Sequence, residues 1–541
     1  MSSLTSKQIS KKLDINEIVA TILKKRGIDT DNKIDSFLNS GLKELYDSSM
    51  MPGAKEVSKK IKEYAIFGGT IIIYCDYDCD GITSAYIMKK AIKKMASSSD
   101  VTIFISDRFR DGYGLSKNSV DIISKEKADL VITLDCGIAN HDEIEYAKDK
   151  SIETVIIDHH EEIEPPEVPF VDLKVKQGDY PFRGLCSAGV TWKFCRYMLD
   201  EEYTEALDIA AIGTVADVVP LVDENRIIVK EGIKKIKKGK ANKGIKSLME
   251  VNDIEKKDFK SNDIGYGIGP MVNAAGRLGS AYPALEILLE EDKQKRTSLA
   301  GKLESINKQR RDITKSVFNE VKNKANKDNN VIVCETEAHQ GIVGLIAGRV
   351  KREFNKPAIV VDELSRKGSC RSVKPFNIYK NLKACLDKGL LNEAGGHEMA
   401  AGIRVSKKDL DSFKKEINKM AEGIDYKVSS HDIEIETDQI DDGLLKDLEL
   451  LEPCGKGNEK PRFLTKNIKA DNVWVLPGND HVKFSVNGIE AIAFYMAEYE
   501  DLLRNNKVDI VYNLNYNKWN GSKNIQLNIR EINRGNKNET R

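Results

Sequence analysis

The stretch TIIIYCDYDCDG (70–81) decides the fold, because a short run of apolar, mostly β-branched residues ends abruptly in three aspartates and a glycine. Three more runs repeat this design at a spacing of roughly 25 residues, with helical stretches between them: VTIFIS (101–106), DLVITLDCG (129–137) and ETVIIDHH (153–160). Short apolar strands that alternate with helices are typical of a parallel sheet covered on both faces. We therefore predict an α/β fold.

Acidic and imidazole side chains end three of these strands at the same relative place: Asp76, Asp78 and Asp80, then Asp135, then Asp158 with His159 and His160. Open α/β sheets bind their ligands at the carboxyl ends of the strands, so these side chains are expected to converge on one edge. Without counter-charge, they would repel one another severely. A pair of divalent cations would neutralise them, and Asp217, near the end of an apolar helix (205–221), is a candidate for a further ligand.

Each of these residues also has a simpler interpretation. An Asp at a strand end is usually a turn former or a helix N-cap, and a His–His pair is usually polar surface. The pattern D-x-D-x-D-G also begins an EF-hand loop, but Lys89 stands nearest to the place of the required Glu, and the pattern follows a strand. Joint occurrence on successive strands favours a metal site. Oxygen and nitrogen ligands without thiolates suit manganese, with magnesium as the cellular competitor.

Two such ions would support the hydrolysis of a phosphate ester or anhydride.

The composition is compatible with a nucleic-acid substrate. The 541 residues contain 85 Lys+Arg and 85 Asp+Glu, and this zero net charge excludes a wholly basic coat but not a locally basic groove. Hydrophobic residues make up 40% and charged residues 31%, as in a globular protein rather than a disordered one. At about 150 residues per domain, the length predicts three or four domains.

The nine cysteines include no C-x-x-C pair, which predicts buried reduced thiols rather than disulfides or a thiolate zinc site. No apolar run approaches the roughly 18 residues of a membrane span, and the N-terminus MSSLTSKQISKKLDINEI lacks the apolar core of a secretory signal. We therefore expect a cytoplasmic protein without a membrane partner.

Four motifs resemble, in order, those of the DHH phosphoesterase superfamily: YCDYDCDG (74–81), TLDCG (133–137), IIDHH (156–160) and GTVADVVPL (213–221). The motif GGHEMAAG (395–402) resembles the signature of the DHH-associated domain. Within the superfamily the chain resembles the RecJ family on six more motifs: RFRDGYGL (108–115), CSAGVTWK (186–193), GPMVNAAGRLG (269–279), HQGIVGLIAGR (339–349), KGSCRS (367–372) and LEPCGKGN (451–458). The similarity covers nearly the whole chain, including NKWNG (517–521).

The resemblance implies a metal-dependent exonuclease that degrades single-stranded DNA in the 5′-to-3′ direction, releases mononucleotides, and acts in DNA repair and recombination. It implies two Mn²⁺ or Mg²⁺ ions, and a helicase and a single-strand-binding protein as partners. Carried over by motif, the metal ligands are Asp76, Asp78, Asp80, Asp135, His159, His160 and Asp217. Asp158 joins the catalytic set by orienting its neighbours, as carboxylates commonly do for metal-bound imidazoles.

The implied fold class is α/β, with a parallel-sheet DHH catalytic domain, a second α/β DHH-associated domain and a C-terminal all-β oligonucleotide-binding-like domain. Hairpin signals between alternating strands independently predict the last of these. The predicted segments are an N-terminal helical segment (1–60), the DHH catalytic domain (61–225), a helical linker region (226–328), the DHH-associated domain (329–428) and the C-terminal domain (429–541).

A bound single strand needs cationic groups along its backbone and flat surfaces for its bases. The candidate contacts are Arg108, Tyr113, Arg277, Arg310 with its neighbour Arg311, His339, Gly341, Arg349, Ser369, Arg371, Ser372, Gly395, Gly396 and His397. Gly341 either helps to cradle a phosphate at a helix start or allows close helix–strand packing. His397 either contacts the terminal nucleotide or is a buried structural histidine, and Tyr113 either stacks on a base or packs in the core. The lysine-rich run 230–246 is either a solvated helix face or a groove wall.

The chain departs from the family pattern at three places. Asp172 and Leu173 stand before Lys174 where Asn-Pro-Lys is usual, Met271 stands where a basic residue is common, and Cys454 replaces an aromatic residue. Two rival functions are a DHH enzyme acting on small molecules or very short RNA, and a scaffold that binds DNA without cutting it. The length and the additional motifs argue against the first rival, and the complete ligand set argues against the second.

Overall fold

The computed structural model describes residues 3–161, 164–175, 178–426, 431–478, 480–519 and 522–535, so the NKWNG stretch lies partly outside the described residues. The chain divides into two compact units. We call residues 46–219 and 228–427 the α/β unit, and residues 1–45, 220–227 and 428–541 the β-unit. The five segments predicted from the sequence remain a prediction.

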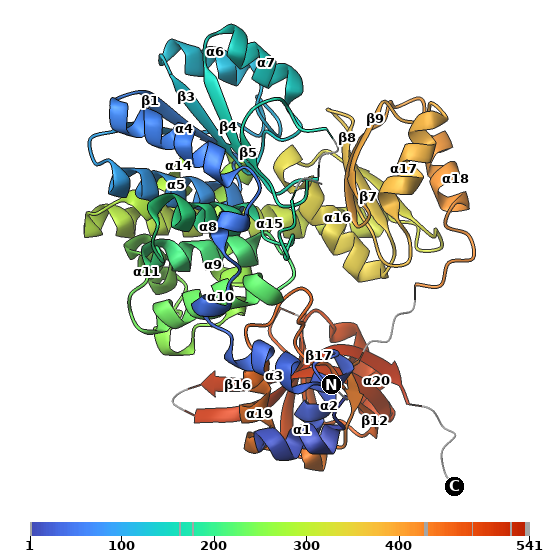
Figure 1. Cartoon of the computed structure of the whole chain (residues 1–541). Helices are drawn as coiled ribbons and strands as arrows, with labels where there is room; N and C mark the ends of the chain where they lie inside the picture. Colours follow the sequence, from blue (N-terminus) through green and yellow to red (C-terminus); the bar gives the residue numbers. More distant parts are fainter. Residues whose placement is uncertain are drawn as a thin grey trace. The chain divides into compact units, whose positions relative to one another are not determined.

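The α/β unit begins with a five-stranded sheet, sheet A, in which every pairing is parallel. Its order is β2-β1-β3-β4-β5, formed by β1 (Thr70–Cys75), β2 (Asp100–Ile105), β3 (Leu130–Leu134), β4 (Glu153–Ile157) and β5 (Phe170–Val171). The central strand β3 is wholly buried, as its uninterrupted apolar sequence requires. The predicted parallel sheet is therefore confirmed (Figure 1).

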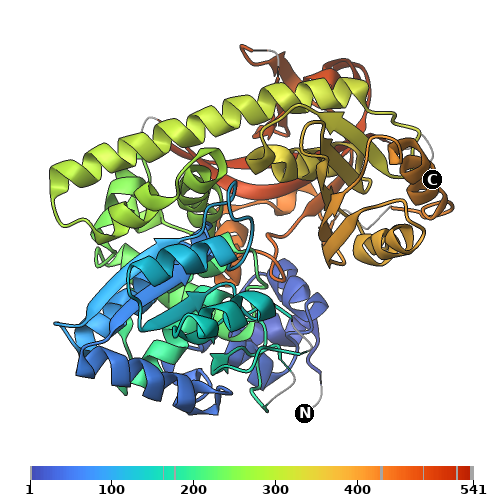
Figure 2. The ribbon, with the colours of Figure 1, turned by 90° about the horizontal axis from the view of Figure 1, so that it is seen from above.

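Helices connect and cover these strands: α4 (Ala54–Phe67), α5 (Cys79–Met95), α6 (Lys117–Lys125), α7 (His141–Asp149), α8 (Ser187–Leu199) and α9 (Leu207–Ala216). A helical region follows, formed by α10 (Asp223–Lys237), α11 (Lys243–Val251), α12 (Ser261–Asp263), a π-helical turn (Ile264–Ile268), α13 (Gly269–Leu278), α14 (Tyr282–Leu289) and α15 (Lys293–Lys324). The long α15, visible along its length in Figure 2, packs on α13 and also on α16 of the following region.

The second sheet, sheet B, has the order β6-β7-β8-β10-β9. It contains β6 (Ile332–Thr336), β7 (Ala358–Asp362), β8 (Lys367–Arg371), β9 (Glu393–His397) and β10 (Ala400–Arg404), with α16 (Gln340–Phe354), α17 (Ile378–Asp387) and α18 (Leu410–Lys419) around it. Successive residues of β7 point to opposite faces, so Ile359 joins one hydrophobic cluster and Val360 the other. This region is the predicted second α/β domain.

The β-unit is built on a seven-stranded sheet of order β11-β12-β16-β17-β15-β14-β13. Its strands are β11 (Ile433–Glu434), β12 (Phe463–Ile468), β13 (Asp471–Val475), β14 (Val482–Val486), β15 (Ile489–Ala493), β16 (Val508–Trp519) and β17 (Ser522–Arg534). Its helices are α1 (Ser6–Leu13), α2 (Glu17–Lys25), α3 (Asp31–Asn39), α19 (Asp442–Leu448) and α20 (Glu500–Asn505). The C-terminal β domain predicted from the hairpin signals is confirmed.

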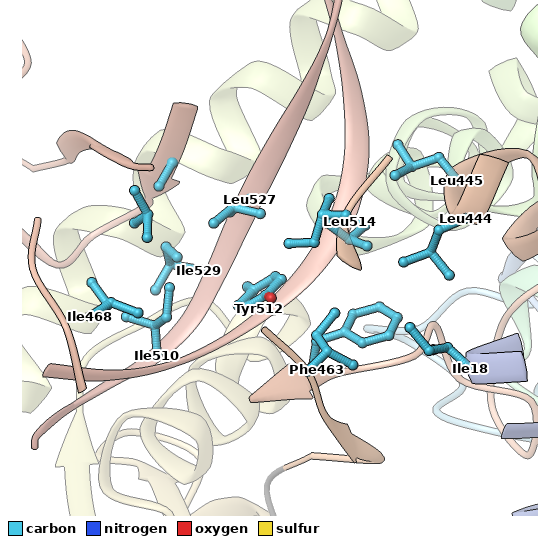
Figure 3. Packing of buried hydrophobic residues seen from close by; sticks show 14 of the residues in the cluster. Ile18, Leu444, Leu445, Phe463, Ile468, Ile510, Tyr512, Leu514, Leu527 and Ile529 are labelled. Atoms are coloured by element: carbon cyan, nitrogen blue, oxygen red, sulfur yellow. The ribbon is translucent and has the colours of Figure 1, made fainter. Parts of the chain in front are cut away.

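One hydrophobic core joins the two ends of the chain in the β-unit. Ile18 of α2 belongs to the same cluster as Phe463 and Tyr512 of the sheet (Figure 3). The acidic segment 432–452 contributes Leu444 and Leu445 of α19 to this core. Part of that acidic segment therefore packs into the core of the β-unit.

All nine cysteines are buried and form no disulfide, which confirms the predicted reduced thiols. Among the helices of the described ranges, none is long and apolar enough to cross a membrane.

Candidate metal centre

The seven side chains predicted as metal ligands lie together where the strands of sheet A end. They form three overlapping groups whose ligand atoms lie within 4.8 Å of one another: Asp76, Asp78 and Asp135; Asp80, His159 and Asp217; and Asp135, His159 and His160. Because Asp135 and His159 each belong to two groups, the three groups form one cluster. The predicted convergence is present in the structure, and the role of each ligand stays a prediction.

The turn between β1 and α5 contains Asp76 and Asp78. Asp78 is the N-cap of α5, and its Oδ1 accepts hydrogen bonds from the backbone N–H groups of Asp80 (2.9 Å) and Gly81 (3.2 Å). A Cβ at Gly81 would lie 2.4 Å from the carbonyl oxygen of Asp76, so the turn requires glycine there. The helix-cap interpretation of Asp78 is thus confirmed, and it coexists with a place in the cluster.

Asp80 lies in the first turn of α5 and is only 1% exposed. Its Oδ2 accepts a hydrogen bond from the backbone N–H of Ser187 (2.7 Å), and its Oδ1 accepts one from that of Ala188 (2.8 Å), both at the start of α8. Burial and the charge of Asp78 raise the pKa of Asp80 to about 6. The CSAGVTWK motif therefore serves to fix Asp80.

Three more carboxyl groups of the cluster, those of Asp76, Asp135 and Asp217, also ionise with difficulty. Burial and the charge of Asp78 raise the pKa of Asp76 to about 8. The pKa values of Asp135 and Asp217 lie well above the usual range, because burial and the charge of Asp80 disfavour both anions. Asp135 follows β3 directly at a φ of 62°, a left-handed conformation that Asp tolerates better than most residues.

Asp158 is fully buried beside the two histidines. Its Oδ1 accepts hydrogen bonds from the backbone N–H of His159 and from Nδ1 of His160, each at 2.7 Å. Burial opposes ionisation of Asp158, but the charge and hydrogen bond of His160 outweigh it and hold the pKa of Asp158 at about 2. Asp158 raises the pKa of His160 to about 9 against the effect of burial. These contacts support the predicted orienting role of Asp158.

The donor set fits divalent cations. Within the described ranges, none of the five ligand carboxylates forms an ion pair with a lysine or arginine. His159 lies within 4.0 Å of Asp80, Asp135 and Asp217, but burial lowers its pKa to about 3, so this histidine is neutral and supplies no counter-charge. The buried Oδ1 of Asp135 accepts no hydrogen bond from a described residue and lies 3.3 Å from Nε2 of His159. Carboxylate oxygens and imidazole nitrogens without thiolates are the ligands of Mn²⁺ and Mg²⁺ rather than of a structural zinc.

Tyr113 is 54% exposed, so the core-packing interpretation of this residue is wrong. Its hydroxyl donates a hydrogen bond to the carbonyl oxygen of Asp135 (3.1 Å) and lies 2.9 Å from Nδ1 of His160. The guanidinium of Arg108 stacks 3.8 Å from the ring centre of Tyr77. The RFRDGYGL motif therefore borders the cluster through both its arginine and its tyrosine.

The glycine-rich start of α16 packs on the end of α13. A Cβ at Gly341 would lie 1.9 Å from the carbonyl oxygen of Arg277, and Arg277 Nη1 donates a hydrogen bond to the carbonyl oxygen of Gly341 (3.2 Å). The backbone N–H of Gly341 donates to Nδ1 of His339, the N-cap of α16 (3.3 Å). Gly341 is thus needed for close packing, although against another helix rather than a strand. Its phosphate contact stays a prediction.

Basic side chains gather near α16 in two small groups. Burial and the charges of Arg311 and Arg349 lower the pKa of Arg310, which places these three arginines near one another. Nη1 of Arg371 donates a hydrogen bond to Oγ of Ser369 (3.1 Å). A Cβ at Gly344 would lie 3.1 Å from that same Oγ, so glycine allows Ser369 and Arg371 to approach the helix.

Ser372 is a predicted contact of the DNA strand, and that contact stays a prediction. It is fully buried and its hydroxyl donates a hydrogen bond to the carbonyl oxygen of Phe376, so the side chain has a structural role. By contrast, Gly395, Gly396 and His397 on β9 are exposed, and the buried-histidine interpretation of His397 is wrong. At Gly396, φ is 134° and a Cβ would lie 2.6 Å from the carbonyl oxygen of Ala400, which explains the glycine.

The lysine-rich run 230–246 forms the end of α10, a turn and the start of α11. Lys235 pairs with buried Asp208 (2.7 Å), and Lys243 pairs with Glu291 (2.6 Å). Part of the run is therefore neutralised locally, and its role as a groove wall stays a prediction.

Two residues that support the cluster were not predicted from the sequence. Ser106 follows β2 and its hydroxyl donates a hydrogen bond to Oδ1 of Asp76 (3.3 Å). Asn273 of α13 accepts one from the backbone N–H of Cys79 (2.9 Å). The strand-end rule that found the aspartates would also have found Ser106. No local signal marks Asn273, because its partner is almost two hundred positions away in the chain.

The three departures occupy buried positions. Asp172 follows β5, and burial together with the charge of Asp158 raises its pKa to about 8. Met271 is fully buried, and its Sδ lies 2.7 Å from Nδ2 of Asn252. Cys454 lies in the core of the β-unit. Met271 therefore places a buried apolar side chain where the family commonly has a basic residue.

A parallel sheet whose strand ends gather five carboxylates and two imidazoles, joined to a second mixed sheet, defines a divalent-metal phosphoesterase of the DHH type. Comparison with known proteins agrees. Models of the DHH family N-terminal domain, the DHHA1 domain and the RecJ OB domain match residues 70–214, 328–423 and 431–531, respectively.

The chain is 32% identical to the single-stranded-DNA-specific exonuclease RecJ of Bacillus subtilis (strain 168), covering 97% of this chain and 69% of that protein. It is 30% identical to the protein of the same name in Escherichia coli (strain K12), covering 72% and 76%. The crystal structure of RecJ in complex with Mn²⁺ from Thermus thermophilus superposes with a TM-score of 0.84 at 26% identity, covering 99% of this chain and 79% of that one. This chain belongs to the RecJ family.

Proposed function

We propose that this protein is a metal-dependent exonuclease that degrades single-stranded DNA from the 5′ end and releases mononucleotides. The observation that carries the proposal is the single cluster of seven candidate ligand side chains at the strand ends of sheet A. The relatives also support the proposal, because the matched proteins from Bacillus subtilis and Escherichia coli are both named single-stranded-DNA-specific exonuclease. The 5′-to-3′ polarity and the mononucleotide product are inferred from the sequence resemblance.

In this proposal, two Mn²⁺ or Mg²⁺ ions are held by Asp76, Asp78, Asp80, Asp135, His159, His160 and Asp217. Such ions supply Lewis acidity toward the phosphodiester and lower the pKa of water. Asp158 keeps His160 oriented through the 2.7 Å hydrogen bond to Nδ1. The hydroxyl of Tyr113 also limits the rotation of this ring, because it lies 2.9 Å from Nδ1 and 3.1 Å from Nε2.

The DNA strand is proposed to lie against the basic residues near α16. Arg310 is suited to a phosphate because its Nε is buried without a hydrogen-bond partner among the described residues. Exposed His397 and Gly395 on β9 are suited to a terminal nucleotide, since a glycine permits close approach of the backbone. The remaining proposed contacts are Arg108, Tyr113, Arg277, His339, Gly341, Arg349, Ser369, Arg371 and Gly396.

The proposal also includes a role in DNA repair and recombination, a cytoplasmic location, and a helicase and a single-strand-binding protein as partners. These parts follow from the sequence resemblance.

The direct test is digestion of single strands labelled at either end, with Mn²⁺ present. We expect the 5′ label to be released first as a mononucleotide, and Asp135→Asn to reduce the rate by at least about 100-fold, as loss of a metal ligand usually does, while strand binding persists. Undiminished cleavage by Asp135→Asn would show that the site is misplaced. Preference for a dinucleotide over a long 5′-phosphorylated strand would favour the small-molecule enzymes instead.

A further inference from the structure

One helical stretch of the α/β unit contacts both chain segments that carry aspartates of the metal centre. It runs without interruption from residue 261 to residue 278 and comprises α12, the π-helical turn and α13. We call it the bracing helix. Glycines lie where it meets these segments: Gly265, Gly269 and Gly276. The helix backbone can therefore approach its partners more closely than larger side chains would allow.

The C-terminal end of the bracing helix packs on the turn 76–80, which contains three of the candidate ligands and which we call the aspartate turn. A Cβ at Gly276 would lie 2.6 Å from the carbonyl oxygen of Tyr77 in this turn. The carbonyl oxygen of Gly276 also accepts a hydrogen bond from Nε of Arg108 (3.2 Å), whose guanidinium stacks on the ring of Tyr77. The aspartate turn is therefore in direct contact with the bracing helix.

Asn273 of the bracing helix completes the cap of α5. The first backbone N–H groups of a helix have no partner within it and need an acceptor from outside. The side chain of Asp78 accepts the hydrogen bonds from Asp80 and Gly81. Oδ1 of Asn273 accepts the one from Cys79 (2.9 Å). Because Cys79 stands between Asp78 and Asp80, this contact fixes the backbone between two candidate ligands.

The N-terminal part of the bracing helix packs on the end of α9. A Cβ at Gly269 would lie 3.2 Å from Cβ of Ala216, the last residue of α9. In the π-helical turn, a Cβ at Gly265 would lie 3.7 Å from Cγ1 of Val215. Asp217 follows Ala216 directly and is the C-cap of α9. The bracing helix therefore contacts the residue before Asp217 as well as the aspartate turn.

Asp217 requires a support other than the sheet, because no strand positions it. Parallel pairing aligns the ligands that follow β1, β3 and β4, whereas Asp217 follows a helix. Yet Asp80 and Asp217 belong to the same group of candidate ligands, together with His159. The relative placement of these two aspartates therefore depends on packing contacts such as those of the bracing helix.

We propose that Asn273 is a positioning residue: it fixes the aspartate turn to the bracing helix, and thereby fixes Asp80 relative to Asp217 for metal binding. This inference rests on the proposed function, because it takes both aspartates to be metal ligands. Coupling of this kind is reciprocal, so a metal ion bound through these aspartates also stabilises the bracing helix.

The first test is calorimetric titration of the metal-free full chain with Mn²⁺. Asn273→Ala is expected to weaken Mn²⁺ binding about tenfold, a typical cost of losing a residue that supports a metal ligand. Asn273→Asp should restore the affinity, because it keeps an acceptor oxygen at the same place whether or not it is ionised. Asn418→Ala is the matched control, since Oδ1 of Asn418 on α18 also accepts a 2.9 Å hydrogen bond, from the backbone N–H of Val331. The control should lower the stability and leave the Mn²⁺ affinity unchanged.

A double-variant cycle tests the link to Asp217. Asn273→Ala should weaken Mn²⁺ binding less in the Asp217→Asn background than in the wild type, because the aspartate turn then no longer has to meet Asp217. Additive losses would overturn that link. Equal weakening by Asn273→Ala and Asn418→Ala, or by Asn273→Ala and Asn273→Asp, would overturn the positioning role.

The last test needs no variant of Asn273, so it remains decisive where Asn273→Ala fails to fold. Mn²⁺ should slow hydrogen exchange in α13 of the wild-type chain and leave exchange in α18 unchanged. Normal Mn²⁺ binding by Asp217→Asn would overturn the ligand assignment of the proposed function. Weakened binding by Asp217→Asn, together with unchanged Mn²⁺ affinity of Asn273→Ala or unchanged exchange in α13 of the wild type, would overturn the positioning role alone.

Discussion

The buried carboxyl groups of the metal centre are suited to binding metal ions, but their burial lowers the stability of the metal-free fold. Asp76 and Asp80 are buried carboxyl groups whose pKa values rise to about 8 and about 6, since burial and neighbouring charge disfavour their anions. The protonated forms therefore dominate the metal-free protein at low pH, and a metal ion must displace protons in order to bind. The same carboxylates that bind metal ions destabilise the metal-free fold when they are ionised.

This predicts a specific pH dependence. A raised pKa means that the folded state binds the proton more tightly than the unfolded state, so the stabilisation is full below about 4 and is lost as the pH rises toward the folded value of about 8 for Asp76. The Tm of the metal-free protein should therefore fall between pH 5 and pH 8, and Mn²⁺ should raise Tm more at pH 8 than at pH 6. The measurement is thermal unfolding with and without Mn²⁺, and Asp76→Asn should flatten the metal-free profile. A wild-type profile as flat as that of the variant would contradict the pKa argument.

At the scale of elements, the contact between α13 and α16 joins the second α/β region to the helical region that follows sheet A. Gly341 is the point of closest approach, because the carbonyl oxygen of Arg277 occupies the place of a Cβ. The arginine and the glycine also share a hydrogen bond of 3.2 Å. A residue that the sequence suggests for phosphate binding thus also determines the packing of two helices.

Gly341→Ala should lower the free energy of unfolding by about 1–3 kcal/mol, the usual cost of overpacking, because α16 must move away from α13. The matched control is Gly348→Ala on the same helix, where no atom lies within 4 Å of an added Cβ. There the gain in helix propensity predicts a stabilisation of up to about 1 kcal/mol. Urea unfolding measures both. Equal effects of the two substitutions would show that the contact with Arg277 is unimportant.

At the scale of the whole molecule, the β-unit depends on both ends of the chain. Leu23 of α2 is fully buried in the cluster that also contains Phe463 and Ile510. The backbone N–H of Asn16 donates a hydrogen bond to Asp447 Oδ2 (2.7 Å), which ties the N-terminal helices to the acidic segment. The N-terminal helices are therefore part of the β-unit core.

Leu23→Ala should destabilise the β-unit by about 2–5 kcal/mol, because it removes a buried leucine from a shared core. The nearby exposed residue Lys24 provides the control Lys24→Ala, which should change the stability by less than about 0.5 kcal/mol. Hydrogen exchange followed by mass spectrometry locates the effect, which should include residues 463–468 and 508–514. Loss of protection confined to residues 6–39 would mean that the helices fold independently of the sheet.

The sequence predicts much of the metal centre because the relevant signals are local. An apolar run ending in Asp135 or in Asp158 and His159 specifies both a buried strand and the side chains at its end. Parallel pairing then brings those ends together without further information. The environments of Tyr113 and His397 could not be predicted, because a few neighbouring residues in the sequence do not determine whether a side chain is buried or exposed.

The sequence by itself therefore determined which segments form buried strands, which of these strands end in acidic residues, and the order of the regions. It could do so because the hydrophobic period and the turn residues act over a few positions. Only the tertiary structure decided that Asp80 is fixed by Ser187, that Gly341 meets Arg277, and that Arg226 donates hydrogen bonds to the carbonyl oxygens of Phe37 and Leu451. Those contacts join residues far apart in the chain. They depend on how whole elements pack, and no local pattern of side chains encodes that.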